Sequence, residues 1–381
     1  MIRSTQALLH AVSFASVKKR AGRFGVVLLG ALLTSSALVI GGAGPAAAAV
    51  PDRWGFAYMN VPVPPGPGTL IDTTRQWGSW KTFAPGAWAT VDPIGVGRYR
   101  VHFPFTASVG GVAHVTAVAP DARHCQVFNN FASGTDQLVD VQCYKFPGIP
   151  DWSRFTVVYS TSSGAAPIPG LYAYVYANIL GGTINSFNSS GVPNSVVHIG
   201  VGQYRVTLPN MSGGSLDGDV QVTAQHPNSP RRCKVGSWTP AGGPSLSVHV
   251  LCFDGTSALA DSWFNLTFQA KRAIFGALAP PFNLAYLWSL GLGTGADYNS
   301  MGCVNSVIPA GVGQYLVLFP CVGVKETHVQ VTAYGFSRDW CNLQEVWQFN
   351  GTTVVVRNVI CFNGAGVQAP NEYMVTYSSR A

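Results

Sequence analysis

Charged residues are scarce in this chain, and its first 49 residues contain no carboxylate at all. Lys, Arg, Asp and Glu make up only 10% of the 381 residues, and five basic residues within 1–49 account for most of the formal net charge of +7. The rest of the chain has 18 basic and 16 acidic residues, so neither sign dominates. This balance argues against a nucleic-acid binder, which keeps a basic face. The 47% of apolar residues excludes a disordered chain.

The chain also lacks the short motifs that carry common catalytic and metal chemistry. It has no Gly-x-Ser-x-Gly sequence around a nucleophilic serine and no Cys or His pair at zinc-ligand spacing. Asp217-Gly-Asp219 lacks the further ligands and closing Glu of a calcium loop, so it is interpreted as a turn. We therefore predict a protein that is not an enzyme and has no cofactor and no metal site. Catalytic groups that converge from distant segments stay an open alternative.

Residues 1–49 have the three parts of a secretory signal peptide. A basic stretch comes first, an apolar run over 24–40 follows, and a tail of small residues ends at Ala49. These parts predict cleavage after Ala49. An uncleaved anchor is the alternative, because the apolar run approaches the ~20 residues that span a bilayer. No cysteine precedes Cys125, which excludes a lipid-modified cysteine. We expect a secreted, extracellular protein without membrane contact after cleavage.

Three copies of one sequence unit fill the rest of the chain. Each copy has a Gly-x-Tyr motif, a Val-Thr-Ala segment and two cysteines, the second of which lies 12 residues before an aromatic residue. The motif tyrosines are Tyr99, Tyr204 and Tyr315, which gives periods of 105 and 111 residues. Such periods indicate whole domains, since solenoid repeats have ~20–50 residues. The predicted domains are 50–163, 170–272 and 282–381.

Only one polar residue recurs in all three units, the threonine of the Val-Thr-Ala segment at Thr116, Thr223 and Thr332. A catalytic site present in every unit would repeat a set of polar residues, so we interpret this lone strand threonine as structural. The second connector, 269–281, contains Ile274 and Phe275. We expect this apolar connector to let units two and three pack together.

Inside each unit, apolar and polar residues alternate. Tyr99, Val101 and Phe103, for example, are separated by polar residues, and 50–381 shows no convincing helical period. This alternation predicts half-buried antiparallel strands. We predict an all-β fold of three tandem antiparallel β-sandwiches, each with six to eight strands and one internal disulfide. A jelly-roll wiring of the strands is an alternative.

Eight cysteines in an exported chain predict disulfide bonds. Eight cysteines allow about 105 pairings, and the repetition selects the pairing inside each unit. The predicted pairs are Cys125–Cys143, Cys233–Cys252, Cys341–Cys361 and, in the third unit alone, Cys303–Cys321. Closing a loop of this size contributes ~3 kcal/mol in the chain-entropy model.

Four tryptophans are crowded into the opening of the first unit: Trp54, Trp77, Trp80 and Trp88. Exposed aromatic side chains in loops stack on ligand rings and fill interfaces, so these four are candidate ligand-binding residues. The alternative is that they cap the ends of the sandwich. The first unit also has extra residues near 64–89, which make a longer loop where a function specific to this unit would lie.

The combination of Gly-x-Gly-Gln-Tyr-x-Val, Val-Gln-Val-Thr-Ala, Cys-x-x-x-x-Trp and Cys-Phe covers most of 54–378. It resembles tandem-repeat secreted proteins of high-GC Gram-positive and other soil bacteria. The resemblance implies export and repetition, and it implies no activity.

Taken together, these features predict a secreted, non-catalytic, multi-domain binding or structural protein that acts at the cell surface or in the medium. Its expected partner is an extracellular glycan, the envelope or another protein, and neither nucleic acid nor membrane. An extracellular protease inhibitor or regulator is the alternative, and a secreted hydrolase comes after it.

Overall fold

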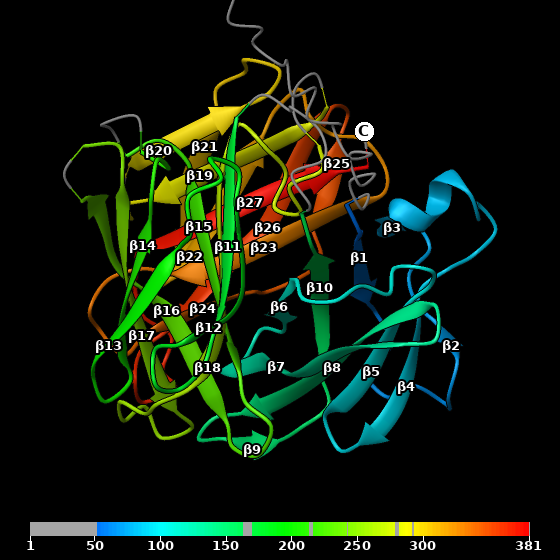
Figure 1. Cartoon of the computed structure of the whole chain (residues 1–381). Coiled ribbons are helices and arrows are strands. Elements are labelled where there is room, and N and C mark those ends of the chain that lie inside the picture. The colour runs from blue at the N-terminus through cyan, green and yellow to red at the C-terminus, as the bar shows by residue number, and fades with distance from the viewer. Residues whose placement is uncertain are drawn as a thin grey trace, which may run out of the picture. The chain divides into compact units, whose positions relative to one another are not determined.

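β-Strands dominate the computed structural model, which describes residues 52–162, 170–212, 216–241, 243–278, 282–291 and 293–380 (Figure 1). The predicted signal peptide over 1–49 lies outside these residues. Within them the one helical element is the short 3₁₀ helix η1 (Ser79–Thr82). In this part of the chain no helix is long and apolar enough to cross a membrane.

Each sequence repeat forms two facing sheets, and we call the one that carries the Val-Thr-Ala segment the inner sheet. In the first repeat the inner sheet has the order β3 (Gln76–Gly78), β1 (Trp54–Met59), β10 (Arg154–Ser160), β6 (Val112–Val118). The outer sheet has the order β2 (Thr69–Leu70), β4 (Thr90–Gly95), β5 (Arg98–Phe103), β8 (Asp136–Lys145), β7 (Arg123–Ser133), with β9 (Ile149–Pro150) beside β8.

The second repeat has the same strand order. Its inner sheet is β12 (Thr183–Asn188), β11 (Leu171–Ala177), β18 (Trp263–Ala270), β15 (Asp219–Gln225). Its outer sheet is β13 (Ser195–Gly200), β14 (Gln203–Leu208), β17 (Leu246–Asp254), β16 (Arg231–Pro240).

The third repeat follows the same order again. Its inner sheet is β20 (Thr294–Asn299), β19 (Leu284–Ser289), β27 (Tyr373–Ser379), β23 (Thr327–Ala333). Its outer sheet is β21 (Ser306–Gly311), β22 (Gln314–Phe319), β26 (Thr353–Phe362), β24 (Trp340–Leu343), with β25 (Gln348–Asn350) beside β26. The predicted all-β, sandwich-like fold is confirmed, while the domain boundaries and the jelly-roll alternative stay predictions.

The apolar alternation in the sequence places one face of each sheet in a core between the two sheets. In β5, Tyr99, Val101 and Phe103 are fully buried, and the residues between them are half-buried. Removing these side chains from water is the main driving force for stacking the sheets. Each repeat has its own apolar cluster of this kind.

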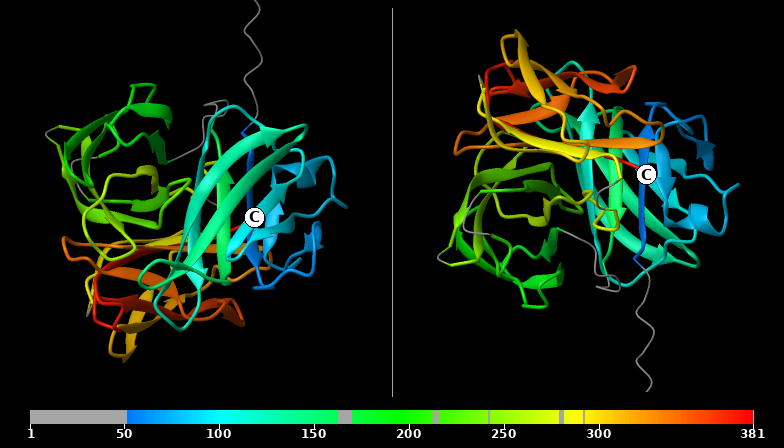
Figure 2. Two further views of the ribbon diagram at one scale, coloured as in Figure 1. Left: turned by 90° about the horizontal axis from the view of Figure 1, so that it is seen from below. Right: turned by 90° about the horizontal axis from the view of Figure 1, so that it is seen from above.

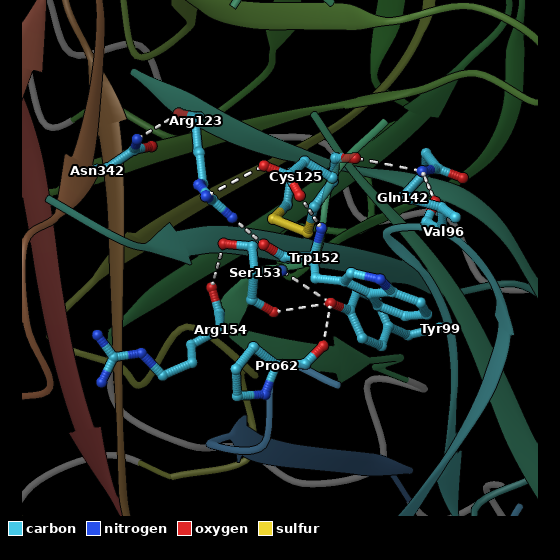
Figure 3. The surroundings of a disulfide bond; sticks show 12 residues. Pro62, Val96, Tyr99, Arg123, Cys125, Gln142, Trp152, Ser153, Arg154 and Asn342 are labelled. Atoms are coloured by element: carbon cyan, nitrogen blue, oxygen red, sulfur yellow. Dashed lines mark hydrogen bonds and ion pairs between the residues drawn. A yellow bond between two sulfur atoms is a disulfide. The ribbon is translucent and has the colours of Figure 1, made fainter. Parts of the chain in front are cut away.

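The Gly-x-Tyr motif ties the outer sheet to the closing strand of the repeat. Gly97 has a φ of +63°, and a Cβ there would lie 2.4 Å from the carbonyl oxygen of Asp151, so only glycine fits. Two residues later, Tyr99 Oη accepts the backbone N–H of Ser153 at 2.8 Å, just before β10 begins (Figure 3). The tyrosines of the other two repeats accept N–H groups at the equivalent positions, at 3.1 and 3.2 Å. This bond explains the constant 12-residue spacing between cysteine and aromatic residue.

The three repeats are joined in a closed ring by short parallel contacts. The pair Val127–Gln225 joins repeats one and two, Val235–Tyr334 joins two and three, and Leu343–Val118 joins three and one. These three contacts use equivalent positions in each repeat. Figure 2 shows the strands of the three repeats as three groups, blue to teal, green, and yellow to red, each beside the other two. Contacts therefore unite all the described residues in one compact unit.

The recurring threonine forms a second ring of contacts between repeats. The backbone N–H of Val115 donates to Thr223 Oγ1 at 3.4 Å, that of Val222 to Thr332 at 3.0 Å, and that of Val331 to Thr116 at 3.1 Å. Each bond runs from one repeat to the next in the same cyclic order. The interpretation of this threonine as structural agrees with these bonds, and they explain why it alone recurs.

The inner sheets bury polar side chains against one another. His114 of the first repeat bonds Thr223 and Thr267 of the second at 3.1 and 2.8 Å, and His328 of the third bonds Thr156 of the first at 2.8 Å. Burial lowers the pKa of each histidine to about 3, so both are neutral in the folded protein.

A buried carboxylate, Asp219, lies in the inner sheet of the second repeat. It accepts amide N–H bonds from Gln221 and Gln269. No ion pair reaches it within the described ranges, and burial raises its pKa to about 7.

The apolar connector after the second repeat packs against the first repeat. Ile274 and Phe275 form a cluster with Trp54 and Phe56, and the rings of Trp54 and Phe275 stack with centroids 4.1 Å apart. The sequence led us to expect repeats two and three to pack together at this connector. Ile274 does contact both of them, since its carbonyl accepts a bond from Tyr172 Oη at 3.0 Å and its N–H donates to Ser378 Oγ at 3.3 Å. The contact with the first repeat was not expected, and the ring explains it because it brings that repeat next to the connector.

We predict that replacing His114 with glutamine, the residue at the equivalent positions of the other repeats, makes the protein more resistant to acid. The pKa of His114 falls from 6.5 to about 3 on folding, so its contribution is complete above pH 6.5 and is lost as the pH falls. The parent should lose about 3 kcal/mol through this group by pH 4. Thermal unfolding followed by circular dichroism from pH 7 to 4 should give a flatter curve for His114→Gln. Parallel curves would contradict the assignment.

We predict the opposite pH dependence for Asp219→Asn. Because folding raises the pKa of Asp219 from 3.8 to about 7, this carboxyl destabilises the fold progressively from pH 4 to 7 and by a constant amount above that. Asp219→Asn should therefore stabilise the protein at pH 8 by on the order of 2–4 kcal/mol and leave it unchanged near pH 4. Denaturant unfolding at the two pH values measures this difference. The exposed neighbour Asp217→Asn is the control, and an equal effect of both substitutions would refute the prediction.

Candidate functional site

All four predicted disulfides are formed. Cys125–Cys143, Cys233–Cys252 and Cys341–Cys361 each join directly paired residues of neighbouring outer-sheet strands, and Cys303–Cys321 occurs only in the third repeat. No free cysteine is found among the described residues. Disulfides persist in oxidising surroundings, so the four bonds indicate an extracellular type of environment.

Arg123, the first residue of the strand that carries Cys125, fixes this strand to the third repeat. The Arg123 carbonyl accepts a bond from the Asn342 side chain (Figure 3). It also accepts one from Trp340 Nε1 at 3.0 Å. The Arg123 guanidinium forms ion pairs with Asp121 and Asp151 at 2.8 and 3.1 Å. These contacts hold the start of β7 in place at the junction of two repeats.

The four candidate tryptophans of the first repeat lie in different surroundings. Trp54 and Trp77 line a surface hollow of about 700 Å³. Trp80 is fully buried in the sandwich core, and Trp88 is exposed but does not line the hollow. The structure therefore brings two of the four together at one site.

Trp80 is a core residue because two glycines leave room for its ring. A Cβ on Gly55 or Gly78 would lie 2.6 or 1.9 Å from the Trp80 ring. The indole N–H is also satisfied, since it donates to the Ala87 carbonyl at 3.1 Å. Trp80 has no exposed surface through which to contact a ligand.

Lys81 holds Trp88 beside the core. Its ammonium group lies 3.2 Å from the centroid of the Trp88 ring and 5.4 Å from that of Trp77, and it donates to the Pro85 carbonyl at 2.8 Å. Burial lowers the pKa of Lys81, and Glu326 opposes this shift. A cation over an aromatic ring is stabilising, so Trp88 has a structural partner of its own.

The hollow around Trp77 combines aromatic surface with cationic groups. Phe83, which is 55% exposed, adds a third ring, and the charged residues Asp52, Arg53 and Arg380 also line the hollow. The Arg380 guanidinium lies 4.8 Å from the Trp77 ring centroid and pairs with Glu326 at 3.0 Å. Ala277 and Leu278 of the second connector complete the apolar wall.

Sequence reasoning missed Phe83, Arg53 and Arg380 as lining residues. Phe83 belongs to the extra segment over 64–89, so its position there was a usable signal. Arg380 had no such signal, because only the ring of repeats brings the end of β27 next to the first repeat.

Two histidines pair with aspartates, as the histidine and aspartate of a catalytic triad do. His102 pairs with Asp92 at 2.9 Å, and His198 pairs with Asp261 at 2.8 Å. Among the described residues neither histidine bonds a serine, threonine or cysteine. No group of three His, Cys, Asp or Glu residues is placed to hold a metal ion in that part of the chain.

Comparison with known proteins yields no relative: no family model, no curated protein and no solved structure matches this chain.

We predict that Trp80→Ala destabilises the protein strongly and that Trp88→Ala does not. Removing a fully buried indole leaves a cavity and should cost about 3–5 kcal/mol. Trp88→Ala removes mainly the contact with Lys81, which should cost about 1–2 kcal/mol. Urea unfolding followed by circular dichroism measures both substitutions. Equal stability of the two variants would contradict the burial of Trp80.

Proposed function

We propose that this protein is a secreted, non-catalytic binding protein that holds an acidic glycan in the hollow around Trp77. The observation that carries the proposal is the meeting of a half-exposed indole, a second exposed ring and two guanidinium groups in one hollow. Its volume of about 700 Å³ lies in the range of sites that bind small ligands, ~300–1,000 Å³.

The aromatic groups supply the apolar part of the site. Trp77 and Phe83 present accessible ring surface, and Trp54 is fixed beneath by its stacking on Phe275. Sugar rings have apolar C–H faces that pack flat against such aromatic surfaces. A glycan therefore matches the shape and chemistry of this wall.

The arginines supply the acidic preference. Guanidinium groups bind carboxylates through two parallel N–H bonds, which neutral sugars do not offer. Arg53 and Arg380 both line the hollow, beside the single carboxylate among its described lining residues, Asp52. Arg380 is held in place by Glu326 and by the Trp77 ring. A polysaccharide that bears carboxylates can pack its sugar rings on the aromatic side chains and pair its carboxylates with the arginines. The four disulfides support a role outside the cell.

We predict that the chain is retained on immobilised polygalacturonate and much less on neutral dextran. Trp77→Ala should weaken retention by about tenfold or more, because it removes the central stacking surface. Arg53→Gln should weaken binding to polygalacturonate and leave any residual binding to dextran unchanged.

Two matched substitutions control this experiment. Trp88→Ala removes an exposed tryptophan outside the hollow, and Arg357→Gln removes an exposed arginine outside it. Both should bind like the parent, and circular dichroism should show that all variants are folded. Absence of retention on polygalacturonate, or equal retention of parent and Trp77→Ala, would sink the proposal.

A further inference from the structure

The residue that precedes the first cysteine differs in the three repeats, and the ring brings the three together. These residues are His124, Arg232 and Trp340. The Arg232 guanidinium lies 3.9 Å from the Trp340 ring centroid, and the positive charge of Arg232 is felt at His124. All three are buried and line one cavity. One position of the repeat thus supplies three unlike side chains to a shared site.

This cavity, which we call the axial cavity, is built from equivalent positions of all three repeats and has a volume of about 50 Å³. The Val-Thr-Ala segments form one part of its wall, together with the first cysteine of each repeat. The polar wall consists of His124, Arg231, Arg232, Lys234, Asp339 and Asn342. A water molecule needs ~10–15 Å³ of such space, so the cavity has room for one ion of a few heavy atoms.

Several buried donors in this cavity lack a partner. Both ring nitrogens of His124 and Nη1 of Arg232 make no hydrogen bond within the described part of the chain. These side chains are only 4% and 6% exposed. Lys234, at 2% exposure, donates to Ser337 alone among the described residues, at 3.1 Å to its carbonyl and 3.3 Å to its hydroxyl. Unmet buried donors are costly, so such a cluster indicates an acceptor that the protein does not itself supply.

The charge in the cavity is only partly compensated, by Asp254 near Arg232 and by Asp339 and Glu372 near Lys234. Three basic side chains line it against the single carboxylate of Asp339, which is half-buried. Among the described residues no ion pair involves Arg232 or Lys234. The Trp340 ring offsets part of the cost of burying Arg232, and the Arg232 Nη2 bond to Ser257 at 2.6 Å satisfies another donor. Neither contact supplies negative charge.

We propose that the axial cavity is a binding site for a small oxyanion such as phosphate or sulfate. His124 and Arg232 donate to its oxygens from two repeats, and the Lys234 ammonium group balances its charge. Because residues of all three repeats line the cavity, the bound ion joins the repeats and stabilises the ring.

A bound oxyanion would change the protonation of these basic groups. Burial lowers the pKa of Lys234 to about 8 and that of Arg232 to about 10, and it lowers the pKa of His124 well below its ordinary value. Asp339 and Glu372 raise the Lys234 pKa, Arg232 lowers it, and Asp254 raises that of Arg232. An oxyanion among these groups favours their charged forms and reverses the effect of burial.

Calorimetric titration of the full, oxidised chain with inorganic phosphate and with sulfate tests this site. The ionic strength is held constant with chloride, and one ion per chain should bind. Lys234→Gln introduces the residue of the equivalent position in the first repeat, Gln126, and removes one buried charge. It should raise the dissociation constant by about tenfold or more.

Two further variants keep the test decisive. His124→Phe retains a ring to stack on Tyr144, 5.3 Å away, but removes both nitrogens, so it should also weaken phosphate binding. Lys325→Gln removes an exposed charge outside the cavity and should bind phosphate like the parent. Without oxyanion, Lys234→Gln should melt at the same temperature as the parent or higher. Phosphate should raise the melting temperature of the parent and of Lys325→Gln clearly more than that of Lys234→Gln.

Phosphate and sulfate that bind no better than chloride would overturn the proposal. Equal phosphate affinity in the parent and Lys234→Gln would overturn it as well. Loss of polygalacturonate binding leaves this experiment unaffected, because the two sites share no residue.

Discussion

The structure depends on closing three sandwiches into a ring, because the outward faces of the inner sheets are polar yet buried. In an isolated sandwich, Thr116, Gln221 and His328 would face water. In the ring they face other repeats, where every buried donor and acceptor needs a partner. The recurring threonine meets this need with one hydroxyl per repeat, which accepts a backbone N–H from the preceding repeat. Closure also sets which strands meet, since each short parallel contact uses the same two positions of the repeat.

Residues that recur in all three repeats build the scaffold of the ring. Residues that differ between the repeats give particular sites on the ring their own chemistry. Gly97, Tyr99 and the paired cysteines recur because each repeat must solve the same folding problem: a tight turn, a tied closing strand and a cross-strand link. Positions that do not recur are under no such shared requirement. Equivalent positions of the three repeats meet at the ring axis. Where the three repeats have different residues at such a position, three different side chains therefore come together. His124, Arg232 and Trp340 are such a set.

Much of the fold could be predicted from the sequence, because period-two alternation and cysteine spacing report local geometry. The strands around Tyr99 and the four disulfide pairs follow from these patterns. The same alternation cannot distinguish a polar face that contacts water from one that contacts another repeat. The burial of Gln221 or His328 therefore could not be predicted from the sequence. The candidate site was predictable only in part for a similar reason. Trp80 and Trp77 are three residues apart, yet Gly55 on a distant segment makes room for the ring of Trp80 in the core and leaves Trp77 at the surface.

The proposed glycan site is a product of ring closure rather than of one repeat. Its walls come from the first repeat through Trp77 and Phe83, from the connector after the second through Leu278, and from the end of the third through Arg380. Threefold avidity from identical sites is therefore not expected, since the segments of the other repeats that correspond to 64–89 are shorter. Both the hollow around Trp77 and the axial cavity depend on ring closure, and this links the two sites physically. A ligand that stabilises the ring at its axis also stabilises the alignment of the three segments that form the hollow, so disrupting the repeat contacts should dismantle the hollow without any change in Trp77 itself.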